Sequence, residues 1–165
     1  MAVFLIGCTH FGHRSIIGLV RRPFLSVAAM NEAMIANWNR VVGPEDTVWH
    51  LGDVAFKGAS AEDYLARLNG TIRRVQGNHD RPGWGEDIAT VEHEGTPVVL
   101  CHTPLEEWEG RERGAVHFHA HTHKRPFRSG LRRGHVGADA IGFTPIRLED
   151  AIAGLTEGVS GVTGF

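Results

Sequence analysis

The side chains of this chain that can bind metals or move protons gather in a few short motifs. In chain order the motifs are Cys8-Thr9-His10, Gly52-Asp53, Gly77-Asn78-His79-Asp80, Cys101-His102 and His119-Ala120-His121-Thr122-His123. Imidazole, carboxylate, thiolate and amide oxygen are all donors for divalent metals. Because several of the 11 histidines fall in these clusters, the sequence predicts a metal site.

Hydrolysis by a pair of divalent ions needs a bridging carboxylate, further donors and room for water. Asp53 follows a glycine at an expected strand end, which suits it to bridge. The other donors are Asn78 and the imidazoles of His10, His102, His121 and His123. Since His79 is adjacent to Asn78 but points elsewhere, we expect it to be free for acid–base chemistry.

Alternating strands and helices must position the first three motifs. The expected strands span residues 3–7, 47–51 and 72–76, and the expected helices run from Ser26 to about Val42 and from Ser60 to Leu68. Residues 11–25 are expected to be mostly loop. This β-α-β-α-β order predicts parallel pairing. Ligands of parallel sheets bind beyond the carboxyl ends of strands, where these motifs lie.

The second half of the chain reads as mainly β. We expect a hairpin of residues 88–92 and 97–101 around Glu94-Gly95, strands at 116–119, 127–131, 135–137 and 144–148, and a last helix at 149–155. The last motif follows one of these strands. From these patterns alone the fold class is mixed α/β.

Length and composition limit the class of protein. Residues 1–165 are expected to form a single domain. The formal net charge of -2 is no footprint for nonspecific nucleic-acid binding, although it allows a nucleotide substrate. Two cysteines are too few for a disulfide framework, and no stretch resembles a signal peptide or membrane span. We therefore expect a cytoplasmic protein without a membrane partner.

The motif order resembles the calcineurin-like metallophosphoesterase superfamily, whose motifs read Asp-x-His, Gly-Asp, Gly-Asn-His-Asp/Glu, a later His and Gly-His-x-His. A likeness to small bacterial and phage phosphoesterases rests on Thr9-His10-Phe11-Gly12-His13, Asn37-Trp38-Asn39, Trp49-His50-Leu51-Gly52-Asp53 and Val136-Gly137-Ala138-Asp139. The resemblance covers residues 3–148. It implies an α/β fold with a central β-sandwich flanked by helices.

The resemblance also implies a binuclear metal centre. Cys8, His10 and His123 would hold one divalent ion and Asn78, His102 and His121 the other, with Asp53 between them. A hydroxide bridging the ions would attack a phosphate mono- or diester. His79 would protonate the leaving group, oriented by Asp80. The substrate phosphate would contact His13, Asn78 and His79.

Two positions depart from the family pattern. Ala120 replaces a glycine, which is a small change, and Cys8 replaces an aspartate. A thiolate keeps the charge of a carboxylate but favours zinc or iron over manganese and magnesium. We therefore expect zinc or iron at the Cys8 site and manganese, iron or zinc at the other. A free cysteine can also be a small buried hydrophobe. The alternative function is a metal-binding or phosphate-sensing protein with little turnover.

Other polar residues allow plainer interpretations. We expect Cys101 in the core and His50 packed or hydrogen-bonded on its strand. His117 and His119 share a strand face with His121, so either can support a ligand. Asp139 is either structural or holds a ligand imidazole. Five arginines are expected on the solvated surface: Arg21, Arg22, Arg125, Arg132 and Arg133.

Overall fold

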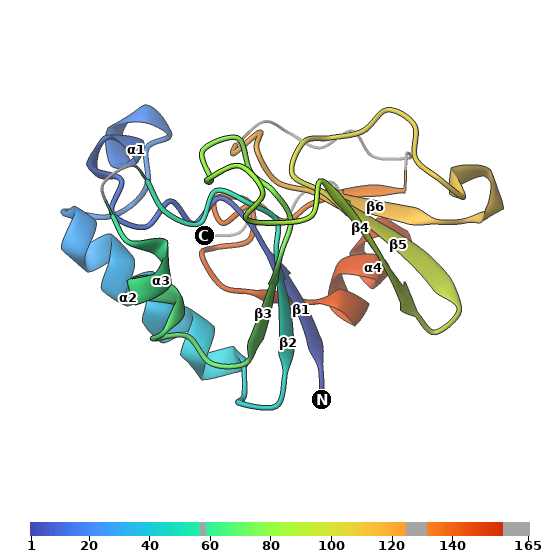
Figure 1. Cartoon of the computed structure of the whole chain (residues 1–165), viewed down its shortest axis with the longest axis horizontal. Helices are drawn as coiled ribbons and strands as arrows, with labels where there is room; N and C mark the ends of the chain where they lie inside the picture. Colours follow the sequence, from blue (N-terminus) through green and yellow to red (C-terminus); the bar gives the residue numbers. More distant parts are fainter. Residues whose placement is uncertain (57–58, 125–131, 157–165) are drawn as a thin grey trace.

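Two four-stranded sheets form the centre of the computed structural model, which describes residues 1–56, 59–124 and 132–156 (Figure 1). The first sheet has the order β3-β2-β1-β8, with β1 at Val3–Ile6, β2 at Thr47–His50, β3 at Thr71–Arg74 and β8 at Ile146–Arg147. The second has the order β4-β5-β6-β7, with β4 at Ile88–His93, β5 at Thr96–Cys101, β6 at Val116–His119 and β7 at Arg133–His135.

The helices lie mainly on one side of the first sheet (Figure 1). They are α1 at Arg14–Leu19, α2 at Val27–Val41, α3 at Ala61–Leu65 and α4 at Leu148–Thr156, with a short 3₁₀ turn at Arg111–Arg113. Ser26 and Ser60 cap α2 and α3 as predicted, accepting hydrogen bonds from the amides of Ala29 and Asp63. Within the described part of the chain, no helix is long and apolar enough to cross a membrane.

Residues 11–25 are mostly loop, as predicted, but they also contain the short helix α1. His13 caps this helix, its Nδ1 accepting from the Ile16 amide at 3.3 Å. Histidine is not among the usual N-cap residues, so the sequence carried no start signal here. The hairpin β4–β5 and the strand β6 were predicted within a residue or two. The strand expected at 127–131 lies outside the described residues.

Parallel pairing brings the motif loops to one edge. β1 pairs in parallel with β2 and β2 with β3, confirming the predicted arrangement. In the second sheet β5, β6 and β7 are also mutually parallel. Beyond β1, Gly7 donates to the Val136 carbonyl and accepts from the Ala138 amide, which joins the two sheets at this edge.

The β1 residues are apolar throughout because each face of the first sheet packs against a different core. On the outer face, Phe4 and Ile6 pack with Met34 and Trp38 of α2. On the inner face, Leu5 packs with residues of the second sheet such as Phe118. A strand buried on both faces is expected to be a continuous apolar run. This double burial fixes the loop that starts at Cys8.

Candidate metal centre

The loops at the shared edge hold their polar residues in an unusual backbone conformation. Five expected ligands have φ between 50° and 60°: Cys8, His10, Asp53, His121 and His123. A non-glycine residue in this left-handed region costs about 1–2 kcal/mol. Strain of this kind clusters at functional sites. The fold therefore holds these particular side chains in place at a cost to its own stability.

Glycines allow two of the loops to touch. A Cβ on Gly52, whose φ is +81°, would lie 2.5 Å from the Gly77 Cα and 2.8 Å from Nδ1 of His102. A Cβ on Gly77 would lie 2.4 Å from Oδ1 of Asp53. The glycines of the Gly-Asp and Gly-Asn motifs are thus required for the close approach that brings Asp53, Asn78 and His102 together.

Asn78, His102 and His121 form the first donor group. The Oδ1 atom of Asn78 lies 2.9 Å from Nε2 of His102 and 3.0 Å from Nδ1 of His121, and the two ring nitrogens are 3.1 Å apart. Donors that bind one metal ion at about 2.1 Å and at right angles are separated by about 3 Å. The donor set therefore fits a divalent ion.

Hydrogen bonds orient this first group. Nδ1 of His102 lies 2.7 Å from the Leu51 carbonyl, so Nδ1 carries a proton and Nε2 faces the other donors. Burial lowers the pKa of His102, but the hydrogen bond and charge of Asp53 outweigh it and raise the pKa overall. Burial likewise opposes the ionised form of Asp53, yet His102, the His79 amide and His10 lower its pKa to about 2. Asp53 is therefore a carboxylate at neutral pH.

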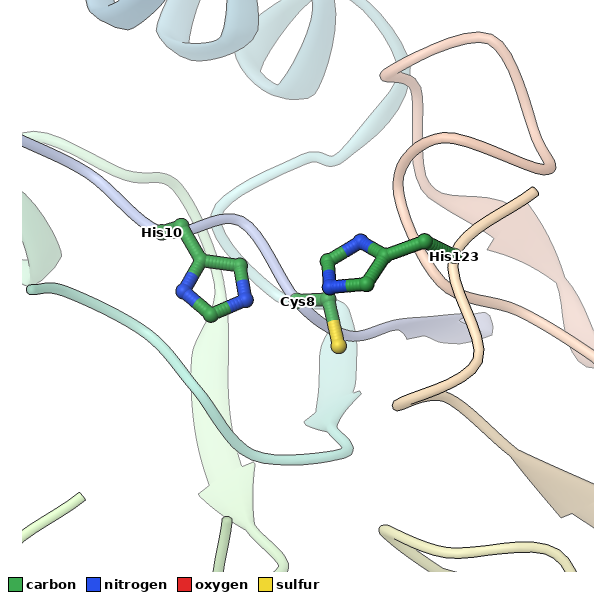
Figure 2. A group of neighbouring side chains, drawn as sticks. All are labelled: Cys8, His10 and His123. Atoms are coloured by element: carbon green, nitrogen blue, oxygen red, sulfur yellow. The ribbon is translucent and has the colours of Figure 1, made fainter. Parts of the chain in front are cut away.

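Cys8, His10 and His123 form the second donor group (Figure 2), with one ligand atom from each lying within 4.8 Å of the others. The Oδ2 atom of Asp53 is 3.6 Å from Nε2 of His10 and 3.3 Å from Nε2 of His102. Asp53 thus lies between the two groups. Both ring nitrogens of the buried His10 have no hydrogen-bond partner among the described residues. Buried polar atoms normally have partners, so this set also fits a metal ion.

Within the second group, the thiol of Cys8 is fully buried. Its Sγ accepts a hydrogen bond of 3.1 Å from the His121 amide. Burial and the charge of Asp53 raise the pKa of Cys8 far above its ordinary value. A metal ion that binds this sulfur must therefore displace its proton.

A buried ion pair supports His123. Nδ1 of His123 lies 2.8 Å from Oδ2 of Asp139, whose carboxylate accepts bonds of 3.0 and 2.9 Å from Arg22. The Arg22 guanidinium also donates to the carbonyls of Cys8 and Thr9. Of the two roles left open for Asp139, a structural one or support of an imidazole, the contact with His123 matches the second. The surface placement of Arg22 was wrong, because its exposed fraction is 4%.

The comparisons with known proteins show the family of this chain. The family model of the calcineurin-like phosphoesterase superfamily domain matches residues 1–136. The chain belongs to this superfamily. It is 36% identical over 155 residues to an uncharacterized protein of Methanocaldococcus jannaschii. The alignment covers 89% of this chain and 87% of that protein.

Solved structures share the calcineurin-like fold. A protein of unknown function from Aquifex aeolicus superposes with a TM-score of 0.72 at 23% identity, covering 90% of this chain and 96% of that chain. A novel archaeal phosphodiesterase superposes with a TM-score of 0.52 at 17% identity, covering 92% and 96%. The predicted α/β fold with a central β-sandwich and flanking helices is thereby confirmed.

In this phosphoesterase the Asp80 carboxylate binds backbone amides. It accepts hydrogen bonds of 2.8 Å from Asp53, 3.1 Å from Val54 and 3.0 Å from Gly77. Asp80 was expected to orient His79, but these bonds tie its carboxylate to the loops that carry Asp53 and Asn78. His79 is instead anchored through its amide, which donates to Oδ1 of Asp53 at 2.8 Å.

Three other buried histidines, His50, His117 and His119, form hydrogen bonds outside the two donor groups. His50 is fully buried and hydrogen-bonds the Thr9 hydroxyl, as expected. His117 and His119 bond the carbonyls of Val99 and Ala120 rather than a ligand side chain. Cys101 is buried as predicted. Arg133 is also buried, against expectation, and donates to the Leu105 carbonyl. Arg125 lies outside the described residues.

Proposed function

We propose that this phosphoesterase hydrolyses a phosphate mono- or diester with two divalent metal ions. One ion would be held by Cys8, His10, Asp53 and His123, and the other by Asp53, Asn78, His102 and His121. When bound, such ions supply an activated water and the positive charge that stabilises the phosphoryl oxygens. The observation that carries this proposal is Asp53 Oδ2, which lies 3.6 and 3.3 Å from imidazoles of the two donor groups.

The chemistry of Cys8 bears on which metals are used. Sulfur favours zinc or iron, so these are the ions we propose at the Cys8 site. The first donor group has only oxygen and nitrogen ligands, which suit manganese, iron or zinc. The carboxylate of Asp139 keeps the Nδ1 proton on His123, which leaves Nε2 of that ring as the metal donor.

We assign His79 as the proton donor to the leaving group. Its side chain is exposed, while its amide is fixed on Asp53 next to both donor groups. An imidazole in this place can transfer a proton to the oxygen that leaves phosphorus. Asp80 acts as a positioning residue through the backbone of Asp53 and Gly77.

His13 is proposed to contact the substrate phosphate. Its Nδ1 accepts from the Ile16 amide, so the proton of the neutral ring lies on Nε2. The ring centroid is 5.7 Å from that of His10. A proton on Nε2 is suited to donate to a phosphoryl oxygen, alongside Asn78 and His79.

Turnover of p-nitrophenyl phosphate and bis(p-nitrophenyl) phosphate, with zinc, iron or manganese added separately, tests the proposal. We expect hydrolysis with at least one metal. His79→Ala should lower kcat about 10²- to 10⁴-fold while the metal content measured by elemental analysis stays the same. Full metal occupancy without turnover under any condition would favour the alternative, a metal-binding protein with little activity.

A further inference from the structure

A small cavity of about 190 Å³ adjoins the candidate metal centre. His79 and Asp80 line it, together with two aromatic residues, Phe56 and Trp84. Complete ligand pockets are typically about 300–1,000 Å³. A cavity of this size therefore accommodates one ring system of a larger substrate whose phosphate lies at the metal centre.

Both aromatic rings are held by contacts on one side. The Phe56 ring stacks on His13 with centroids 3.7 Å apart. The Arg74 guanidinium lies 4.1 Å from the centroid of the Trp84 ring, and the Trp84 amide donates to the Gln76 side chain at 3.0 Å. Because these contacts fix the rings, the cavity offers flat apolar surface without ordering long side chains on binding.

The position of the cavity identifies the part of the substrate that enters it. His79 lines the cavity and is the proposed proton donor to the leaving oxygen. The group attached to that oxygen therefore lies on the cavity side of the phosphate. Two exposed lining residues, Glu62 and Arg81, add an acceptor and several donors. A flat ring with polar edges matches both kinds of surface.

We propose that this cavity binds the base of a nucleotide and that the substrate is a nucleotide ester whose nucleoside is the leaving group. The inference rests on the proposed hydrolase function, because the leaving group is placed in the cavity on the ground that His79 donates its proton to the leaving oxygen. Stacking of a base on an aromatic side chain contributes about 1–3 kcal/mol, which corresponds to roughly a 5- to 150-fold effect.

A matched pair of substrates isolates the base. Adenosine 5′-monophosphate and ribose 5-phosphate share the phosphate and the 5′-oxygen, and their methyl diesters form an equivalent pair. We expect kcat/KM to be about tenfold or more higher for the nucleotide of each hydrolysed pair. Equal values for both members would overturn the base pocket while leaving the hydrolase function intact.

Two variants test whether the cavity is responsible for the preference for the nucleotide over the sugar phosphate. Trp84→Leu and Phe56→Leu should each lower the nucleotide-to-sugar ratio of kcat/KM several-fold. Phe24→Leu makes the same kind of change outside the cavity, where Phe24 contacts Phe143, and should leave the ratio unchanged. Wild-type ratios in both pocket variants, with both proteins folded by thermal melting, would contradict the proposal.

Direct binding separates this inference from the function it rests on. Adenosine should bind the wild-type protein more tightly than ribose in an NMR titration, and Trp84→Leu should abolish the difference. If no ester is hydrolysed but adenosine binds in this way, the hydrolase proposal fails and the base pocket stands. If esters are hydrolysed and adenosine binds no better than ribose, only the base pocket fails.

Discussion

The two donor groups of the candidate metal centre differ in whether their donor atoms have partners. The donor atoms of Asn78, His102 and His121 lie within 3.1 Å of one another. In the second group, by contrast, the ring nitrogens of the buried His10 have no partner among the described residues. The donor separations of the first group match those around a bound ion, whereas the second group contains buried nitrogens that a bound ion would satisfy.

The groups also differ in what lies behind their imidazoles. A neutral carbonyl, that of Leu51, orients His102, whereas the Asp139 carboxylate and Arg22 support His123. A carboxylate behind a ligand imidazole makes the imidazole a better donor. A charged pair therefore supports the site in which cysteine replaces the aspartate of the family pattern. This contrast supports the proposal that the Cys8 site holds an ion.

We expect the largest effect from a substitution at Asp53, the residue that both sites share. Asp53→Asn keeps the size of the side chain but removes the charge between the donor groups. Because charge stabilisation by bound ions is worth several kcal/mol, we expect kcat/KM to fall by about 10³-fold or more. Metal content at both sites should fall. Asp63→Asn, on an exposed turn of α3, is the matched control. Loss of only one ion would show that Asp53 serves a single site.

Cys8 variants should affect one site only. Cys8→Ala is expected to lower the zinc content from two ions toward one, while the Asn78 group keeps its ion. Cys8→Asp restores a hard donor and should shift the preferred metal toward manganese. Elemental analysis after loading with each metal measures both effects. Two ions in Cys8→Ala would remove Cys8 from the ligand set.

The motif spacing predicted which side chains would meet, but not which residues support them. Strand ends after apolar runs predicted that the loops bearing Asp53 and Asn78 would meet, and the parallel register explains why they do. Arg22 could not be recognised in this way. It lies between α1 and α2 in a segment without periodicity, and its partner Asp139 is more than a hundred residues away along the chain. Long-range ion pairs leave no local pattern.

Removing the support behind His123 tests whether it matters for the metal. Asp139→Asn should weaken zinc binding at the Cys8 site about 10- to 100-fold, with little change at the Asn78 group. Arg22→Gln should act in the same direction, since it removes the bonds that fix the Asp139 carboxylate and the Cys8 carbonyl in place. Competition with a chelator gives both affinities. Arg67→Gln, which breaks the exposed pair with Glu32, serves as control. Equal weakening at both sites would indicate general destabilisation.

Not every buried histidine of this fold is arranged for a metal. His117 and His119 lie along β6, and the ring of His119 stacks on His135 of β7 at 4.9 Å. His117 uses both nitrogens on backbone groups, bonding the Val99 carbonyl and accepting from the Leu105 amide. The alternation on β6 made a supporting role at the metal centre plausible from sequence. The Trp108 ring, whose centroid is 5.3 Å from that of His117, adds to the contacts around this histidine.

The last prediction concerns these neutral histidines and the stability of the fold. Their effect must be separated from the loss of metal in acid. Burial lowers the pKa of His117 to about 4, against about 6.5 in the unfolded chain. Below pH 6.5 the unfolded chain takes up a proton that the folded chain does not. Stability is therefore full above pH 6.5 and declines as the pH falls toward 4, by at most about 1.4 kcal/mol per pH unit for this group.

Urea unfolding of metal-free protein between pH 7.5 and 4.5 measures this decline. Protonated His117 would also place an N–H against the Leu105 amide, which reinforces the preference for the neutral ring. His117→Leu should be less stable at pH 7.5 by about 1–3 kcal/mol, because two buried backbone groups lose their partner. Its stability should also depend less on pH. An unchanged pH dependence would mean that His117 does not set the acid limit, leaving buried groups nearer the metal centre to account for it.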